Sequence, residues 1–189
     1  MPTIRYKIWV FIATGLFVIG IAAGLIISAT MPAGITGLLS EELSVLGELS
    51  TMFGPFQATT AVFIFLKNVS SLLFSFIFSP ILCLMPVIAL VLNGTLLSFV
   101  SVIVTREASL GLLLAGVLPH GILEIPAFIM GEAAALSFGA TAIMALLSRE
   151  RRNQLLPNLK QNSKYLLLAF GLLVPAAIIE TFVTPLLLQ

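Results

Sequence analysis

The chain has 189 residues, of which 59% are hydrophobic and only 9% are charged, and its formal net charge is +1. Soluble domains carry about 25% charged residues, so this composition excludes an ordinary water-soluble fold. The near-neutral charge also excludes a basic surface for nucleic acid, and no basic and aromatic binding pattern is present. The apolar runs are continuous rather than alternating, which favours membrane-spanning helices over a membrane β-barrel.

The sequence predicts an all-α fold, a polytopic transmembrane helical bundle that forms a single integral membrane domain over residues 1–189. A helix needs about 18 or more mainly apolar residues to cross a bilayer. About six hydrophobic segments are expected, at 8–29, 56–79, 81–105, 108–130, 132–148 and 165–188. The lipid bilayer of the cell membrane, the cytoplasmic membrane, is therefore the expected environment, crossed several times.

The first segment, 8–29, exceeds the ~7–15-residue apolar core of a signal peptide, so we expect it to be retained as a span. Gly20 and Gly24 form a small-xxx-small pattern, which lets two helices approach closely. We expect this pattern to form a packing groove within the chain, and the alternative is a homo-oligomer through Gly20 and Gly24. The single cysteine, Cys83, lies in an apolar run and has no partner for an internal disulfide.

Residues 31–55 are too polar to span the membrane. Glu41, Glu42 and Glu48 alternate there with leucines and a valine. A short helix with this mixture buries its apolar side at the membrane surface. We therefore predict an interfacial amphipathic stretch over 31–55.

The number of predicted segments conflicts with the distribution of basic residues along the chain. Basic residues gather before the first segment and again between 149 and 164, and the positive-inside rule puts both groups in the cytoplasm. That arrangement requires an even number of crossings between them, whereas five predicted segments intervene. Either the rule fails locally or one segment is broken or re-entrant, lining an interior cavity. The candidates are 132–148 and the pair 56–79 and 81–105.

Few polar side chains interrupt the segments, and most of them are expected at one depth. At ~1.5 Å per residue, Asn68 and Asn93 each lie about 18–20 Å from a turn at Ser79-Pro80. Ionisable side chains at mid-bilayer cost ~2.5–3.5 kcal/mol each and are relieved by pairing or by a wet cavity. We therefore predict a midplane polar cluster, with Lys67 as a secondary member. Its members are Asn68, Asn93, His120, Glu124 and Glu180.

The stretch "VLPHGILEIPAF" carries the centre of this cluster. His120 and Glu124 are four residues apart and share one helix face. Pro119 and Pro126 each remove a backbone donor and bend the helix. Two interpretations stay open: the polar network holds a bent bundle together, or it forms a site for a ligand, a proton or an ion.

The residue types limit the chemistry. One histidine in the whole chain excludes a His-rich zinc site, and the absence of aspartate excludes an aspartyl dyad. No Gly-x-Ser-x-Gly motif is present either. We expect no catalytic residue, no metal site and no cofactor, and hence a non-enzymatic protein. A histidine and carboxylate pair suits proton or cation coupling.

Pro119-His120-Gly121 followed by Glu124 resembles the signature of the stage II sporulation protein M family of integral membrane proteins. Lys67-Asn68, Asn93-Gly94 and the stretch 180–182 resemble other recurrent positions, and the resemblance covers nearly the whole chain. The family often has paired asparagines in its second helix, where this chain has Lys67 first. The resemblance implies a membrane scaffold, because the family's namesake acts in engulfment during sporulation as a scaffold for peptidoglycan-degrading partners.

Two functions are therefore considered. The first is a scaffold or assembly factor whose partners are membrane or envelope proteins. The second is a small transporter or permease subunit whose midplane site binds a proton, a cation or a small polar ligand. A wet cavity at His120 favours the second, and a dry, fully hydrogen-bonded cluster favours the first.

Overall fold

The structure is a computed structural model that describes residues 6–30 and 54–188. Within these two ranges the chain forms helices joined by short turns, and it contains no strand there. The helices are α1 (Tyr6–Thr30), α3 (Ala58–Phe78), α4 (Leu84–Glu107), α5 (Leu110–Leu147), the 3-10 helix η1 (Arg149–Gln154), α6 (Leu155–Phe182) and α7 (Thr184–Leu187). The predicted interfacial stretch 31–55 lies outside the described residues except for its last two positions.

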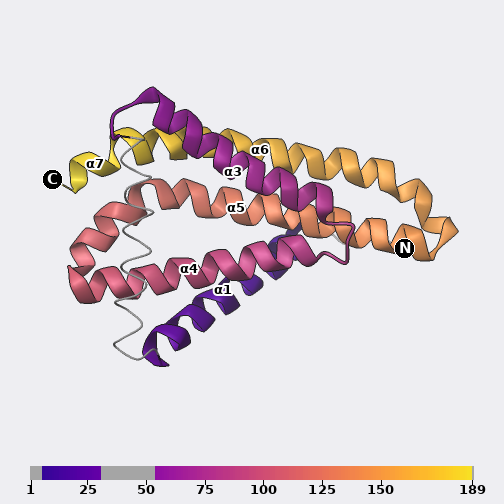
Figure 1. Ribbon diagram of the computed structural model, residues 1–189. Coiled ribbons are helices and arrows are strands. Elements are labelled where there is room, and N and C mark those ends of the chain that lie inside the picture. The colour runs from indigo at the N-terminus through magenta and orange to yellow at the C-terminus, as the bar shows by residue number, and fades with distance from the viewer. Residues whose placement is uncertain (1–5, 31–53, 189) are drawn as a thin grey trace.

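Five helices of the described part are long and apolar enough to cross a membrane: α1, α3, α4, α5, and α6 together with η1. The predicted all-α bundle is thereby confirmed. Figure 1 shows α5 running lengthwise between α1 and α4 on one side and α3 and α6 on the other. Because α5 contacts each of the other four long helices, it forms the centre of the bundle.

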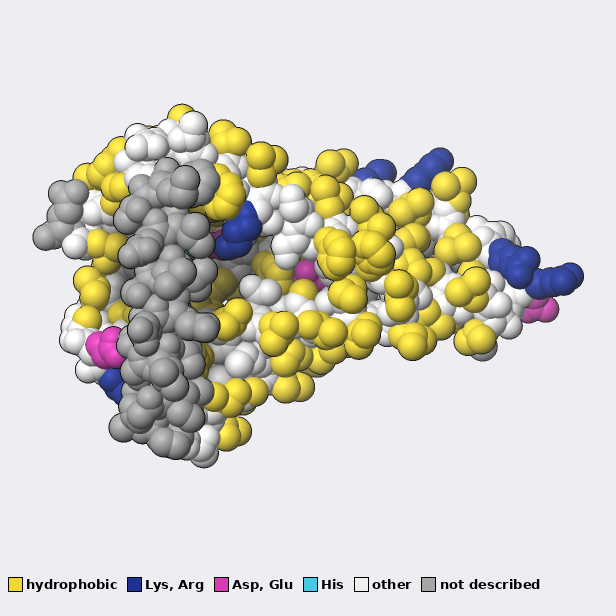
Figure 2. Space-filling model, viewed as in Figure 1, with side chains coloured by type: hydrophobic (Ala, Val, Ile, Leu, Met, Phe, Trp, Pro, Cys, Tyr) yellow, Lys and Arg dark blue, Asp and Glu magenta, His cyan; other side chains and the backbone are white. Residues whose placement is uncertain are grey.

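The outer surface of the bundle is mainly apolar, as expected for helices that cross a membrane. Large apolar side chains point outward from the long helices, as at Phe11, which is 80% exposed, and Ile26, which is 64% exposed. Figure 2 shows hydrophobic side chains over much of the visible surface, whereas Lys and Arg side chains gather at the end where α5 meets α6. Apolar groups on the outside of a helical bundle are stable where lipid replaces water.

Helix α5 differs from the predicted boundaries. Instead of two segments at 108–130 and 132–148, one helix of 38 residues runs through both. Pro119 and Pro126 lie inside it without ending it, and Figure 1 shows its first part bent away from the remainder. The predicted break at Glu132 is absent because this carboxyl is buried against Ser75 of α3 rather than placed at a membrane surface.

The last segment also differs from its predicted range of 165–188. Helix α6 begins ten residues earlier, at Leu155, and ends at Phe182, and the short α7 follows. Asn162 anchors the added part of α6, where it is 1% exposed. Its Nδ2 donates to Ser137 Oγ at 3.1 Å and to Asn158 Oδ1 at 2.8 Å. The polar start of α6 is therefore held against α5.

The turn between α3 and α4 lies where the sequence predicts it. It begins at Ser79, whose carbonyl accepts from Cys83 N at 3.0 Å, and both Leu82 and Cys83 have a positive φ of 54°. The half-buried Cys83 Sγ donates to Leu136 O of α5 at 3.7 Å. Burial raises the pKa of the Cys83 thiol, which leaves it a weak nucleophile.

Helix α1 packs on α4 through small residues. A Cβ added at Gly20 would collide with the Val91 carbonyl of α4, and one at Gly24 would collide with the Thr95 carbonyl. Thr95 Oγ1 also donates to Gly20 O at 3.0 Å, a hydrogen bond between the two helices. The face that Gly20 and Gly24 form is thus occupied by α4 of the same chain.

The continuity of α5 also changes the number of candidate crossings. Among the described residues, four long helices (α1, α3, α4 and α5) run from Lys7 to the basic η1, where five segments were predicted. Four crossings by these helices would return the chain to its starting side, as the positive-inside rule requires. Figure 1 agrees, because α1 begins toward the end at which α5 meets η1.

Candidate functional site

A cavity opens between the helices at the level where the sequence predicts a polar cluster. Its volume is about 190 Å³, and it is partly enclosed. That space is large enough to hold several water molecules. Its walls come from α1, α3, α4, α5 and α6, and five of the six predicted polar residues line it: Lys67, Asn68, Asn93, His120 and Glu124.

Glu124 is the centre of the polar contacts. Asn68 of α3 donates from Nδ2 to Glu124 Oε1 at 2.9 Å. His120, one turn earlier on α5, places Nε2 3.8 Å from Glu124 Oε2. The two carboxylate oxygens therefore face different partners, an amide on a neighbouring helix and a ring on the same helix.

His120 is oriented by a second contact. Its Nδ1 lies 3.4 Å from Thr184 Oγ1 at the start of α7. When Nδ1 carries the proton and donates to this hydroxyl, Nε2 keeps its lone pair on the side of Glu124. Thr184 was not predicted from the sequence, although its place four residues after Glu180, one helical turn on, was a usable signal.

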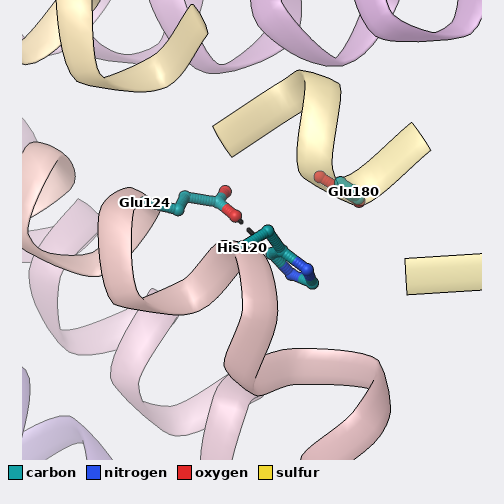
Figure 3. A group of neighbouring side chains, drawn as sticks. All are labelled: His120, Glu124 and Glu180. Carbon is teal, nitrogen blue, oxygen red and sulfur yellow. Dashed lines mark ion pairs between the residues drawn. The ribbon is translucent and has the colours of Figure 1, made fainter. Parts of the chain in front are cut away.

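Glu180 completes the group from α6. It does not line the cavity, but one ligand atom each from His120, Glu124 and Glu180 lies within 4.8 Å of the others. Figure 3 shows His120 and Glu124 on successive turns of α5 and Glu180 across from them on the neighbouring helix. Two ligands that each lie about 2.0–2.2 Å from one metal ion are at most roughly 4.4 Å apart, so a small side-chain movement would suffice to close the group.

Two of the predicted residues contribute less than expected. Asn93 lines the cavity, but its Nδ2 donates to Ala89 O of its own helix at 2.8 Å and does not reach the His120 pair. Lys67 is exposed and lines the cavity, and among the described residues it forms no ion pair with Glu124 or Glu180. The contacts therefore concentrate on Asn68, His120, Glu124 and Glu180.

Glu132 was not predicted as a buried polar residue either, because its charge placed it at the beginning of the predicted segment 132–148. This residue is 0% exposed, and Ser75 Oγ donates to its Oε2 at 2.5 Å. A signal was present, because Ser75 follows Asn68 by seven residues on α3 and Glu132 follows Glu124 by eight on α5. Spacings of seven and eight keep residues on one side of a helix.

The arrangement can bind a small cation or exchange protons. An imidazole nitrogen and two carboxylates are a suitable donor set for divalent first-row transition metals. Ser71 is the one hydroxyl side chain among the residues that line the cavity, and the hydrogen bonds of His120 and Glu124 go to Thr184 and Asn68 instead, so Ser71 lacks the bonded base that covalent catalysis requires. No metal site was expected from the sequence, yet the fold brings three potential ligands together.

Comparison with known proteins identifies one family. The family model described as Stage II sporulation protein M matches residues 13–185, which includes every residue of the cluster. No curated protein and no solved structure matches the chain.

Proposed function

The chain belongs to the Stage II sporulation protein M family, and on that premise we propose that it is a non-enzymatic integral membrane protein that binds a divalent transition-metal cation in a mid-membrane pocket. Of the two functions considered from the sequence, this is the transporter or permease subunit. One observation carries the proposal: His120, Glu124 and Glu180 converge from two helices to within 4.8 Å beside a cavity of about 190 Å³.

The physical argument is electrostatic. Two carboxylates in an apolar bundle are costly to leave without a counter-charge. A divalent cation would offset both carboxylates at once, and Asn68 and Thr184 would hold two of the three ligands in place from outside the coordination shell. Lys67 lines the same cavity, and its positive charge would repel a bound cation. This repulsion limits the affinity of the site for the metal ion.

Metal titration of the purified protein tests this proposal. We expect protein in lipid nanodiscs, prepared without a polyhistidine tag, to bind one equivalent of Zn²⁺ or Mn²⁺ in isothermal titration calorimetry. Glu124→Gln keeps the shape of the side chain but removes its charge, and should weaken binding by about a hundredfold or more. In proteoliposomes the same variant should abolish metal uptake while the protein still assembles.

Two control variants define the outcome. Glu107 lies at the end of α4, away from the cluster, so Glu107→Gln should bind as the wild type does. Lys67→Met removes the opposing charge and should tighten binding severalfold. The proposal fails if the wild type and Glu124→Gln bind both metals with the same affinity.

A scaffold or assembly factor for membrane or envelope proteins is the second candidate. The basic end of the bundle supports it, because η1 presents Arg149 and Arg152, and α6 presents Lys160, as exposed side chains there. Partner proteins that co-purify with the wild type should also co-purify with Glu124→Gln if the protein is a scaffold. If that variant only lowers thermal stability and leaves metal uptake unchanged, the scaffold is the better account.

The orientation of the bundle follows from its charges. Within the ranges that the structure describes, four candidate crossings separate Lys7 from the basic η1, so both should face the cytoplasm across the cytoplasmic membrane. In a Cys83→Ser background, Asn153→Cys in η1 should react with a membrane-impermeant maleimide only in inverted vesicles. Ala108→Cys, between α4 and α5, should react from the outside of intact cells, and the reverse pattern would contradict this orientation.

A further inference from the structure

Glu132 is a carboxyl sealed inside the bundle, separate from the His120 group. It is 0% exposed and lies in a run of seven residues, 131–137, that are all buried. Ser75 Oγ of α3 donates to its Oε2 at 2.5 Å, and its Oε1 has no hydrogen-bond partner. A carboxylate with one bond and one bare oxygen is poorly stabilised in an apolar interior.

No described residue supplies a positive charge to balance Glu132. The ionisable groups that face this part of α5 are Tyr6 of α1, which donates to Met130 O at 2.6 Å, Tyr165 of α6, which stacks on Tyr6, and Cys83, next to α4. All three are neutral in their ordinary protonation states. Helix α3 contributes Ser75 here, and its one basic residue, Lys67, lies two turns away at the cavity.

Leu72 of α3 lies next to both the cavity and Gly131, the residue before Glu132. Leu72 is 1% exposed, lines the cavity, and packs against Gly131, where an added Cβ would lie 2.8 Å from its methyl groups. On α5, Glu132 follows Glu124 by eight residues, or about 12 Å of helical rise. The contact surface between α3 and α5 thus carries two polar pairs, Asn68 with Glu124 and Ser75 with Glu132, and Leu72 lies between them.

We propose that Glu132 is a proton-binding site inside the membrane, closed off from the cavity by Leu72. Its resting form is the protonated carboxylic acid. When Leu72 moves aside, the carboxyl O–H bond breaks, the proton passes to a water molecule in the cavity, and the carboxylate that remains keeps the Ser75 hydroxyl as its donor. This inference does not depend on cation binding at His120, because none of the residues that carry it is a ligand of that group.

Infrared spectroscopy of the full chain in lipid nanodiscs tests the site. At neutral pH we expect a carbonyl stretch of a protonated carboxyl in the wild type. The band should be lost in Glu132→Gln and kept in Glu124→Gln. A band of equal size in Glu132→Gln overturns the assignment, as does a wild-type band that appears only after Na⁺ is removed.

Hydrogen exchange tests the closure. In D₂O the downshift of the band should be slow in the wild type and about tenfold or more faster in Leu72→Ala, because the truncated side chain no longer blocks access. Leu73→Ala, on the exposed side of α3, is the matched control and should leave the rate unchanged. Immediate exchange in the wild type contradicts an occluded site.

A second variant covers the possibility that Glu132→Gln does not fold. Ser75→Ala removes the one hydrogen bond to the carboxyl, so the carbonyl band should move to higher frequency. An unshifted band in Ser75→Ala would assign the protonated carboxyl to another residue and overturn the proposal.

Discussion

Gly94→Leu prevents α1 from packing on α4, and we expect it to have the largest effect of any single substitution in the α1–α4 interface. A Cβ at position 94 would collide with the carbonyl of Phe17 and would lie 3.0 Å from Ile21 N and 3.2 Å from Gly20 Cα. These neighbours are backbone atoms of α1, which cannot rotate away as a side chain can. Overpacking costs typically 1–3 kcal/mol, so a helix pair held apart by its backbone should lose about 3 kcal/mol or more.

The measurement is the yield of folded, monodisperse protein together with its thermal unfolding in nanodiscs. Gly15→Leu is the matched control. Gly15 lies on α1, but a Cβ added there would have no atom of another residue within 4 Å. The control should behave as the wild type does. Equal loss of folded protein in both variants would mean that helix propensity, rather than contact with α4, causes the effect.

Leu90→Ala should give the second largest effect, through a cavity rather than a collision. Leu90 is 0% exposed and packs in the same cluster as Ala13, Phe17, Ala133 and Leu136. Truncating a buried leucine costs about 2–5 kcal/mol in soluble proteins. In a bilayer the lipid is as apolar as the core, so only the lost packing counts and the low end, about 2 kcal/mol, is expected.

The comparison is with Leu92→Ala on the same helix. Leu92 is 52% exposed, and its side chain faces outward, so truncation should change the free energy of unfolding by less than about 0.5 kcal/mol. Reversible unfolding in mixed micelles gives both values. A similar cost for both leucines would contradict the placement of Leu90 in the core.

The sequence was sufficient to predict the parts of the fold that depend on local signals. Apolar run length predicts the helices, and Ser79-Pro80 predicts the turn between α3 and α4. The convergence of Asn68, His120 and Glu124 was also predictable, since buried polar groups in lipid require partners and few were available.

The remaining features depend on contacts between residues far apart in the chain. Glu132 resembles a segment boundary because a charge usually marks the membrane surface, and its partner, Ser75, lies 57 residues away. Asn93 has the right depth for the cluster, but its amide bonds to its own helix instead. Depth along a helix can be counted from the sequence, whereas the direction in which each side chain points depends on how the helices are rotated against one another.

Helix α5 runs without a break from the pocket to the charged end of the bundle, so a change of its bend at one end would displace the other. Its hinge region is the part that contains Pro119 and Pro126, beside His120 and Glu124, and its long arm ends at Leu147, next to the basic η1. From Glu124 to Leu147 the arm measures about 35 Å, so a tilt of only ~5° at the prolines displaces its tip by about 3 Å. A rearrangement at the pocket that changed the bend at these prolines would therefore produce a larger displacement at the charged end of the bundle.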